Sequence, residues 1–472
     1  MRRVLKGLVL VTLLLSGCAQ VGKQQARSTS AGSLAELEIE LPVEKLTLKN
    51  GLTVLLLEDH RLPIYSFYTL YDVGGRYESK GTTGATHFLE HMMFKGSKNY
   101  PPGFFDRFIE SSGGSNNAYT SFDSTVYYQN MPARSLKTMI DLEADRMKSI
   151  LLLPEAFESE RQVILEERKM RYENSPRGKL YLKMMQEVFE GTPYGGSVIG
   201  DIEDIEGLER DRMLEFHKTF YAPNNAVVVI VGDFDSNDAK SWLKKSFSNI
   251  EKNKNLQKLK DEYNAPKVYE TQTKFNREVQ IHGQSKKPVF MMAYKGEKLG
   301  THRSYVLDLL SSMLGGGESS HLNQLYVQTT RPPLSSISVG NYNLKYNGVF
   351  YINGELLDGV SLAGFRKRLL KDSLRFCEDG LSERALQKTK NQYLVGYYKE
   401  LNTNAGLASF LGLRENFFGD YRYYQKELKT YSSIALDEVK ETCRDVFSDK
   451  QQIFLSVWDK HAETKDEGEK NE

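Results

Sequence analysis

Residues 86–94 (THFLEHMMF) constrain this chain more than any other segment, because their polar side chains can act together only on a helix. His87 and His91 are four positions apart, so on a helix the two imidazoles lie on one face, about one turn apart. Glu90 lies on the same face, beside any ion that the imidazoles hold. Two nitrogen ligands next to a carboxylate are the donor set of a hydrolytic zinc site, and the order H-x-x-E-H is associated with peptide-bond hydrolysis.

The histidine pair also has a simpler interpretation. The chain has eight histidines, and two of them can fall four positions apart by chance. The apolar flank favours a metal site, because buried polar groups without partners each cost roughly several kcal/mol. The flanking residues are Phe88, Leu89, Met92, Met93 and Phe94. On the histidine pair alone, both interpretations remain open.

A second segment, residues 153–176, offers a third ligand, and a catalytic zinc usually keeps three protein ligands and one water. A proline near each end suits the start and the end of a helix. Glu160 and Glu167 are seven positions apart and share a face, whereas Glu166 points about 100° away. We therefore predict Glu167 as the third ligand and Glu160 as its outer support. A solvated, charged helix explains the same letters, and geometry alone leaves that alternative open.

Five segments in a fixed order make the chain resemble the pitrilysin family of zinc metallopeptidases. They are the H-x-x-E-H element with residues 94–97 (FKGS), residues 113–128 (GGSNNAYTSFDSTVYY), the pair Glu160 and Glu167, residues 192–205 (TPYGGSVIGDIEDI) and residues 220–235 (FYAPNNAVVVIVGDFD). The resemblance implies an α+β fold, with two homologous α/β-roll halves that enclose a cavity.

The same resemblance implies a role for each residue of the predicted site. His87, His91 and Glu167 would bind one Zn2+ per chain, and Glu90 would act as the general base. Glu160 would be the outer carboxylate. This assignment agrees with the chemistry, because a carboxylate beside a zinc site can take a proton from water and pass it to a leaving amine.

Residues 117–128 are rich in Tyr, Thr, Ser and Val and alternate moderately, which predicts a strand. The resemblance implies an edge strand beside the zinc. A substrate peptide would add to it as a further strand, through main-chain hydrogen bonds with little sequence preference. We expect Asn117 and Ala118 to contact substrate. From these letters alone, an ordinary amphipathic strand is the simpler alternative.

The start of the chain predicts export and a lipid anchor. A basic beginning is followed by a short apolar core at residues 8–15, too short to span a membrane. Residues 15–18 (LSGC) resemble the bacterial lipobox, which implies acylation of Cys18 and anchoring by its acyl chains. Ala19 implies sorting to the outer membrane of a Gram-negative bacterium, facing the periplasm. A plain secretory signal with a coincidental cysteine is the alternative.

At 472 residues the chain exceeds one ordinary core and should divide in two. Residues 220–233 and 447–459 form a faint repeat, since each ends its half with a turn and an apolar strand. Strands alternate with helices in both halves. The expected division is a lipoprotein signal peptide (1–17), a flexible tether (18–40), an N-terminal zinc-binding domain (41–250), a charged linker (251–267), a homologous C-terminal domain (268–460) and a disordered tail (461–472).

Charge and cysteine content limit the remaining possibilities. The 63 basic and 62 acidic residues nearly cancel and form no basic stripe, so we do not expect nucleic acid as a partner. Two cysteines remain after the anchor, Cys377 and Cys443. A disulfide between them and two separate buried thiols are both compatible with the sequence.

The second half departs from the pattern of the family. Self-sufficient members present an Arg and a Tyr, seven residues apart, to the substrate. Placing residues 314–322 (LGGGESSHL) on the family's corresponding segment puts Val327 and Leu334 at those two positions. Donors aimed at a developing oxyanion contribute about 3–4 kcal/mol each. We therefore expect a related partner subunit to bring the Arg/Tyr pair, as in heterodimeric members. The nearby polar residues Tyr326, Arg331 and Tyr342 do not reproduce the spacing.

Two functional interpretations follow. The first is a zinc-dependent endopeptidase that cleaves peptides or unfolded segments held as an added edge strand. The second is a non-catalytic lipoprotein that uses the same fold for peptide binding or assembly. The intact set of His87, Glu90, His91 and Glu167 favours the enzyme.

Overall fold

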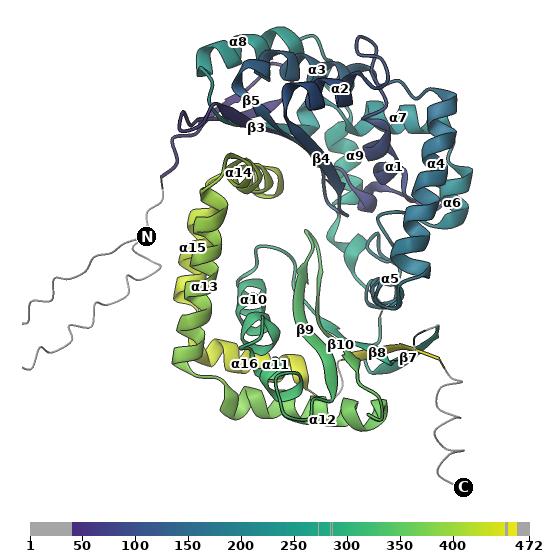
Figure 1. The fold of residues 1–472 in the computed structure, drawn as a ribbon, viewed down its shortest axis with the longest axis vertical. Coiled ribbons are helices and arrows are strands. Elements are labelled where there is room, and N and C mark those ends of the chain that lie inside the picture. The colour runs from purple at the N-terminus through teal and green to yellow at the C-terminus, as the bar shows by residue number, and fades with distance from the viewer. Residues whose placement is uncertain (1–39, 272, 284, 286, 449–451, 460–472) are drawn as a thin grey trace, which may run out of the picture.

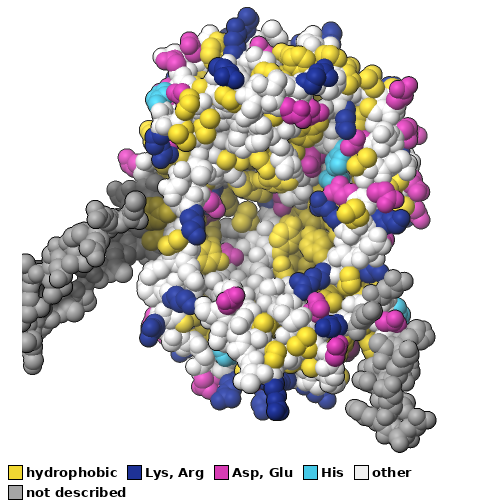
Figure 2. Space-filling view, viewed as in Figure 1, with side chains coloured by type: hydrophobic (Ala, Val, Ile, Leu, Met, Phe, Trp, Pro, Cys, Tyr) yellow, Lys and Arg dark blue, Asp and Glu magenta, His cyan; other side chains and the backbone are white. Residues whose placement is uncertain are grey.

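Two sheets, each covered by helices, form an upper and a lower half in the computed structural model (Figure 1). The structure describes residues 40–271, 273–283, 285, 287–448 and 452–459. The signal peptide, Cys18, the tether up to residue 39 and the tail lie outside these residues. The expectation of an α+β fold with two halves is confirmed, and Figure 2 shows a hollow between them. No helix within the described part is long and apolar enough to cross a membrane.

The first sheet has six strands in the order β1-β2-β6-β3-β5-β4. Only the pair β2 and β6 is parallel. Strand β6 lies inside the sheet, and its apolar run AVVVIVG is buried throughout, as expected for a strand covered on both faces. The strands are β1 (Glu44–Thr47), β2 (Thr53–Glu58), β3 (Ile64–Tyr71), β4 (Ser115–Thr120), β5 (Thr125–Pro132) and β6 (Ala226–Gly232).

The second sheet repeats the arrangement of the first. Its order is β7-β11-β8-β10-β9, and only the pair β7 and β11 is parallel. Strand β11 thus takes the place of β6, which accounts for the repeat seen in the sequence. The strands are β7 (Arg277–His282), β8 (Val289–Lys295), β9 (Leu334–Asn343), β10 (Gly348–Leu356) and β11 (Gln452–Trp458).

The helices fall into two consecutive groups along the chain. The first group is α1 (Ala85–Met92), α2 (Phe104–Ser112), α3 (Leu136–Ser149), α4 (Pro154–Arg168), α5 (Pro176–Val188), α6 (Ile202–Gly207), α7 (Arg210–Phe220), α8 (Ser236–Phe247) and α9 (Leu256–Tyr263). The second is α10 (His302–Gly315), α11 (His321–Tyr326), α12 (Leu362–Arg375), α13 (Glu383–Leu401), α14 (Asn404–Phe418), α15 (Tyr423–Ser433) and α16 (Leu436–Phe447).

One helix of each half packs against the sheet of the other half. Helix α14 covers a face of the first sheet, where its Leu411 shares a buried cluster with Leu70 and Val229. Gly412 permits this close approach, because a Cβ there would lie 2.6 Å from Leu70 Cδ1. Helix α5 in turn packs on the second sheet through a cluster that includes Met184. The sequence division at residues 251–267 therefore separates two sheets and their two main cores, while two further clusters combine residues of both halves.

The segment expected as a charged linker carries helix α9, whose Leu256 is buried in the first core. Lys260 of the same helix lies 2.5 Å from Asp72 at the end of β3. In the second core, Cys377 and Cys443 form a disulfide, which answers the question that the sequence leaves open.

A buried ionic cluster joins the two halves. Lys345, in the β9–β10 turn, lies 3.3 Å from Asp72, and its backbone N–H donates to Asp123. Arg76 is fully buried, with Nε 2.9 Å from Asp123. Burial alone would raise the pKa of Asp72, but Lys345, Lys260 and Arg76 outweigh it and lower the pKa. The charges therefore compensate one another and hold the β9–β10 turn against the first sheet.

Candidate active site

Helix α1 is fixed at its first turn by a carboxylate from another segment. Glu78 accepts hydrogen bonds from the backbone N–H groups of Gly84 and Thr86, both at 2.7 Å. These are two of the donors that a helix N-terminus leaves without partners. Burial raises the pKa of Glu78 to about 7, against the effect of the hydrogen bonds. Gly84 has φ 87°, and a Cβ there would meet the carbonyl oxygen of Ile199 at 2.2 Å.

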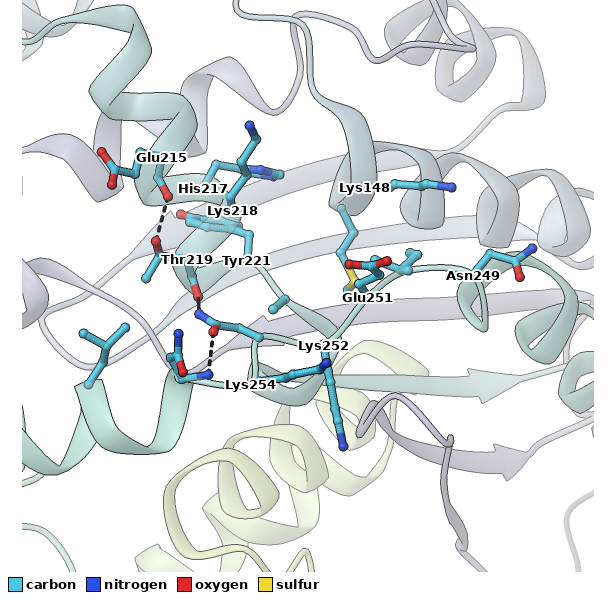
Figure 3. A pocket seen from close by; sticks show the side chains of 16 residues that line it. Lys148, Glu215, His217, Lys218, Thr219, Tyr221, Asn249, Glu251, Lys252 and Lys254 are labelled. Atoms are coloured by element: carbon cyan, nitrogen blue, oxygen red, sulfur yellow. Dashed lines mark hydrogen bonds between the residues drawn. The ribbon is translucent and has the colours of Figure 1, made fainter.

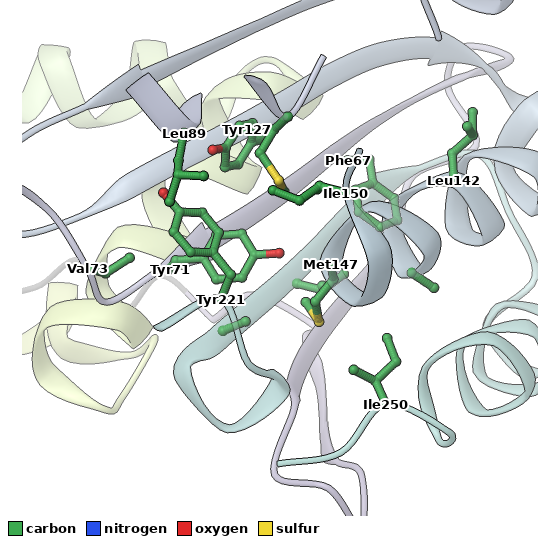
Figure 4. Close-up of a cluster of buried hydrophobic side chains, with 14 of the residues drawn as sticks. Phe67, Tyr71, Val73, Leu89, Tyr127, Leu142, Met147, Ile150, Tyr221 and Ile250 are labelled. Carbon is green, nitrogen blue, oxygen red and sulfur yellow. The ribbon is translucent and has the colours of Figure 1, made fainter. Parts of the chain in front are cut away.

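The apolar face of α1 holds the helix on the first core. Phe88, Leu89 and Met92 are fully buried. Leu89 belongs to a cluster with Tyr71 and Tyr127 (Figure 4). The opposite face of this short helix carries the predicted site, so packing on one side sets the direction of the functional side chains on the other.

The structure brings the three predicted metal ligands together. Nε2 of His91 lies 3.4 Å from Oε2 of Glu167, and Nε2 of His87 lies 3.7 Å from the same oxygen. The three ligand atoms all lie within 4.8 Å of one another. Two helices, α1 and α4, thus present two nitrogens and one oxygen to a common point, which is a donor set that suits zinc.

Glu160 lies behind His91, as the spacing predicts. Nδ1 of His91 donates to Oε1 of Glu160 at 2.9 Å, and Lys95 lies 2.6 Å from Oε2. This bond places a ring proton on Nδ1 and turns Nε2 of His91 toward the site, which is the usual carboxylate support of a metal-binding histidine. The residues present therefore fit a zinc ion. The sequence prediction missed Lys95, although it follows His91 by four positions.

The two imidazoles differ in charge when no metal is bound. Burial, together with the neighbouring His91, lowers the pKa of His87 to about 4. For His91, burial is outweighed by hydrogen bonds to Glu160 and Glu167, and the pKa is raised to about 9. The same bonds lower the pKa of both carboxyl groups. The metal-free site therefore holds one proton on His91 between two carboxylates.

Glu90 is oriented by strand β4. Thr120, the last residue of that strand, donates to Oε2 of Glu90 at 2.5 Å. Burial raises the pKa of Glu90, and the bond from Thr120 opposes the rise. Spacing along the sequence gives no sign of this contact, because the two residues meet only through the packing of α1 beside β4.

Strand β4 is the edge strand predicted beside the site. It pairs with β5 alone in the sheet order, so its other edge is not paired with a described strand. Asn117 is exposed, and Ala118 packs against the first core. The Asn117 side chain accepts the backbone N–H of Ala118 at 2.8 Å. The strand thus has one edge open to a peptide, close to Glu90.

The second half has no hydrogen-bond donor side chain at Val327 and Leu334, the two positions that align with the Arg and Tyr of the family. Val327 packs against the second core, and Leu334 is buried in it. Tyr326 is also buried, and its hydroxyl donates to Asp372 at 2.6 Å. Tyr342 shares a hydrogen bond with Tyr181. Arg331 is exposed in the loop between α11 and β9.

A separate hollow of about 900 Å³ lies beside α7 and the loop after α8 (Figure 3). Burial lowers the pKa of His217 at its wall to about 4, which keeps the ring neutral. The hollow shares no residue with the cluster of His87, His91 and Glu167. We therefore take the cluster of His87, His91 and Glu167, and not this hollow, as the candidate active site. The charged residues that line the hollow are Lys148, Glu215, Lys218, Glu251, Lys252 and Lys254.

Comparison with known families gives two consecutive matches. Residues 54–202 match the model described as "Insulinase (Peptidase family M16)". Residues 207–393 match the model described as "Peptidase M16 inactive domain". The first match contains His87, Glu90, His91, Glu160 and Glu167. The second begins in the upper half and ends within α13 of the lower half.

Curated relatives match over most of the chain. The zinc protease PqqE of Helicobacter pylori is 29% identical, over 87% of this chain and 92% of that protein. A probable mitochondrial-processing peptidase subunit beta of Schizosaccharomyces pombe is 30% identical, over 44% and 45%. A solved structure of a protease from Helicobacter pylori superposes with a TM-score of 0.80 at 26% identity, over 89% of this chain and all of that one.

We predict that zinc binding near neutral pH releases about one proton. In the metal-free chain His91 is protonated, with a pKa of about 9, and it must lose the Nε2 proton to bind a metal. The apparent zinc affinity should therefore rise with pH until the metal-free His91 is itself deprotonated. Calorimetric titration in buffers of different ionisation enthalpy measures the released proton directly. The Glu160→Gln variant should release less, and equal heats in all buffers would contradict the prediction.

Proposed function

This chain belongs to peptidase family M16, the pitrilysin family, and we propose that it is a zinc-dependent endopeptidase that cleaves peptides or unfolded segments. The observation that carries the proposal is the convergence of His87, His91 and Glu167 on one point, with Glu90 held beside it. Relatives named zinc proteases support it, since they match over most of the chain.

The residues of the site divide the chemistry among them. When bound by His87, His91 and Glu167, zinc would polarise the substrate carbonyl as a Lewis acid and lower the pKa of water to about 7. Glu90 takes the proton from the attacking water and later gives it to the leaving amine. Thr120 fixes the carboxylate during both transfers through its bond to Oε2.

Substrate binding is proposed along the open edge of β4. A peptide in extended conformation would pair with the strand at Asn117 and Ala118, and the scissile bond would lie near Glu90. Main-chain hydrogen bonds supply affinity in this mode, so many sequences can bind. The peptide would occupy the hollow between the halves (Figure 2).

Changing Glu90 to Gln should abolish peptide cleavage but leave zinc content unchanged. A general base contributes about 10²–10⁴-fold to the rate, and the amide cannot accept the proton. Zinc per chain by elemental analysis and cleavage of an unfolded reporter peptide measure the two quantities. Glu166→Gln is the matched control, because Glu166 is exposed on α4 next to a ligand and should affect neither. A wild-type chain without zinc would favour the non-catalytic, peptide-binding alternative.

We further propose that a related subunit brings an Arg/Tyr pair to this site. Two observations support the proposal. Val327 and Leu334 are apolar; Leu334 is buried in the second core, and Val327 packs against it. Two relatives are named as subunits of larger assemblies, a processing peptidase subunit and a cytochrome b-c1 complex subunit.

The purified chain alone should cleave peptides about 10²-fold or more slowly than the complex isolated with its partner, since one oxyanion donor is worth about that factor. Affinity purification from native membranes, followed by parallel assays of chain and complex, makes the comparison. Arg331→Ala in the isolated chain is the control. Fast zinc-dependent cleavage by the chain alone, unaffected by Arg331→Ala, would contradict the proposal.

For localisation we propose a lipid anchor on Cys18 in the outer membrane, facing the periplasm. The lipobox-like residues 15–18 support it, and the Cys377–Cys443 disulfide is typical of oxidising compartments. Cys18→Ala should move the chain from the membrane fraction to the soluble periplasmic fraction. Fractionation with immunodetection tests this outcome, and a variant that stays with the membrane would refute the anchor.

A further inference from the structure

Three basic residues lie at the end of helix α4 and in the wide turn that follows it, close to the site. The turn is a π-helical segment, Lys169–Glu173, directly after α4. Arg168 is buried and donates to the carbonyl of Gly200 at 2.7 Å. Lys169 lies 3.6 Å from Glu166, which is exposed. Arg171 lies 2.7 Å from Oε1 of Glu167 and is the member of the three that contacts a metal ligand.

The two oxygens of Glu167 have different partners. Oε2 faces the imidazoles of His87 and His91, and Oε1 is bound by the guanidinium of Arg171. The last torsion of a glutamate side chain is soft, so an unrestrained carboxylate could exchange its oxygens or turn away. An Arg donor on one oxygen leaves the other to the metal. The contact therefore selects one orientation of the third ligand.

The same contact contributes little to stability. The Arg171 side chain is 62% exposed, against 23% for Glu167, and the two are four positions apart. Exposed pairs of this kind contribute little to the free energy of unfolding, because solvent screens them and ordering two long side chains costs entropy. At the site the contact acts through geometry, because it occupies one oxygen of a predicted metal ligand. The site gathers three carboxylates, and among the described lysines and arginines Lys95 and Arg171 form ion pairs with them.

We propose that Arg171 is a positioning residue for the metal site: it holds Oε1 of Glu167 so that Oε2 stays turned toward the two imidazoles. The inference rests on the proposed function only in taking His87, His91 and Glu167 as the metal ligands. It concerns binding of the metal and is independent of whether the loaded chain cleaves peptides.

The test measures zinc affinity of the full chain by competition with a chromophoric chelator. Arg171→Gln should bind zinc about 10–100-fold more weakly, as is usual when a residue that orients a ligand is lost. Arg171→Lys keeps a point charge without the planar fork and should recover part of the affinity. Lys169→Gln removes the same charge from the same turn, away from Glu167, and should bind like the wild type.

Two further measurements separate positioning from folding. The Co2+-loaded Arg171→Gln chain should show a changed d–d absorption spectrum, and its metal-free unfolding midpoint should match that of the wild type. Wild-type zinc affinity and an unchanged cobalt spectrum in Arg171→Gln would overturn the inference. A wild-type chain that binds zinc but cleaves nothing would refute the peptidase and leave the inference intact. A wild-type chain that binds no zinc would overturn both.

Discussion

The contact between Phe88 of α1 and Phe157 of α4 is the interaction on which the rest of the site depends. Their rings stack with centroids 4.5 Å apart. His87 and His91 lie within one turn of Phe88, and Glu167 lies nearly three turns along α4 from Phe157, yet the three ligand atoms lie within 4.8 Å of one another. Neither helix contains a complete metal site. A displacement of either helix by about one rise per residue, 1.5 Å, would separate donors that must meet at bonding distance.

The predictable part of the site is the part with a fixed helical offset. His87, Glu90 and His91 lie on one turn, and Glu160 and Glu167 lie two turns apart, so helical geometry assigns them faces before any packing is known. Arg171 follows Glu167 by four positions, a helical spacing that the prediction did not use. Thr120 and Glu78 were missed for a physical reason. Each is a single polar residue whose partner lies on another segment or beyond a helix end, and its contact depends on tertiary placement alone.

For the fold, the sequence predicted the strands and the repeat but not the placement of the helices. Apolar runs mark β6 and β11, and their equivalent places in two sheets explain the repeat. The polar composition of residues 251–267 predicted a linker, whereas the structure has helix α9 there. Its one buried leucine, Leu256, fixes α9 on the first core. The exchange of α5 and α14 leaves no sign in the sequence. An amphipathic pattern shows that a helix face needs a partner but does not say which sheet supplies it.

The packing of helix α14 on the first sheet constrains the order in which parts of the chain can fold during synthesis. The strands of the first sheet are all synthesised by Gly232, yet the buried helix residues that cover one apolar face of that sheet, among them Leu407 and Leu411, follow Thr403. Closing so long a loop is slow, and an uncovered sheet face invites association with other chains. A growing chain therefore cannot cover both faces of the first sheet before most of the second half has been made. The buried residues of the upper half's main core end at Leu256, but its second apolar cluster is completed only by helix α14.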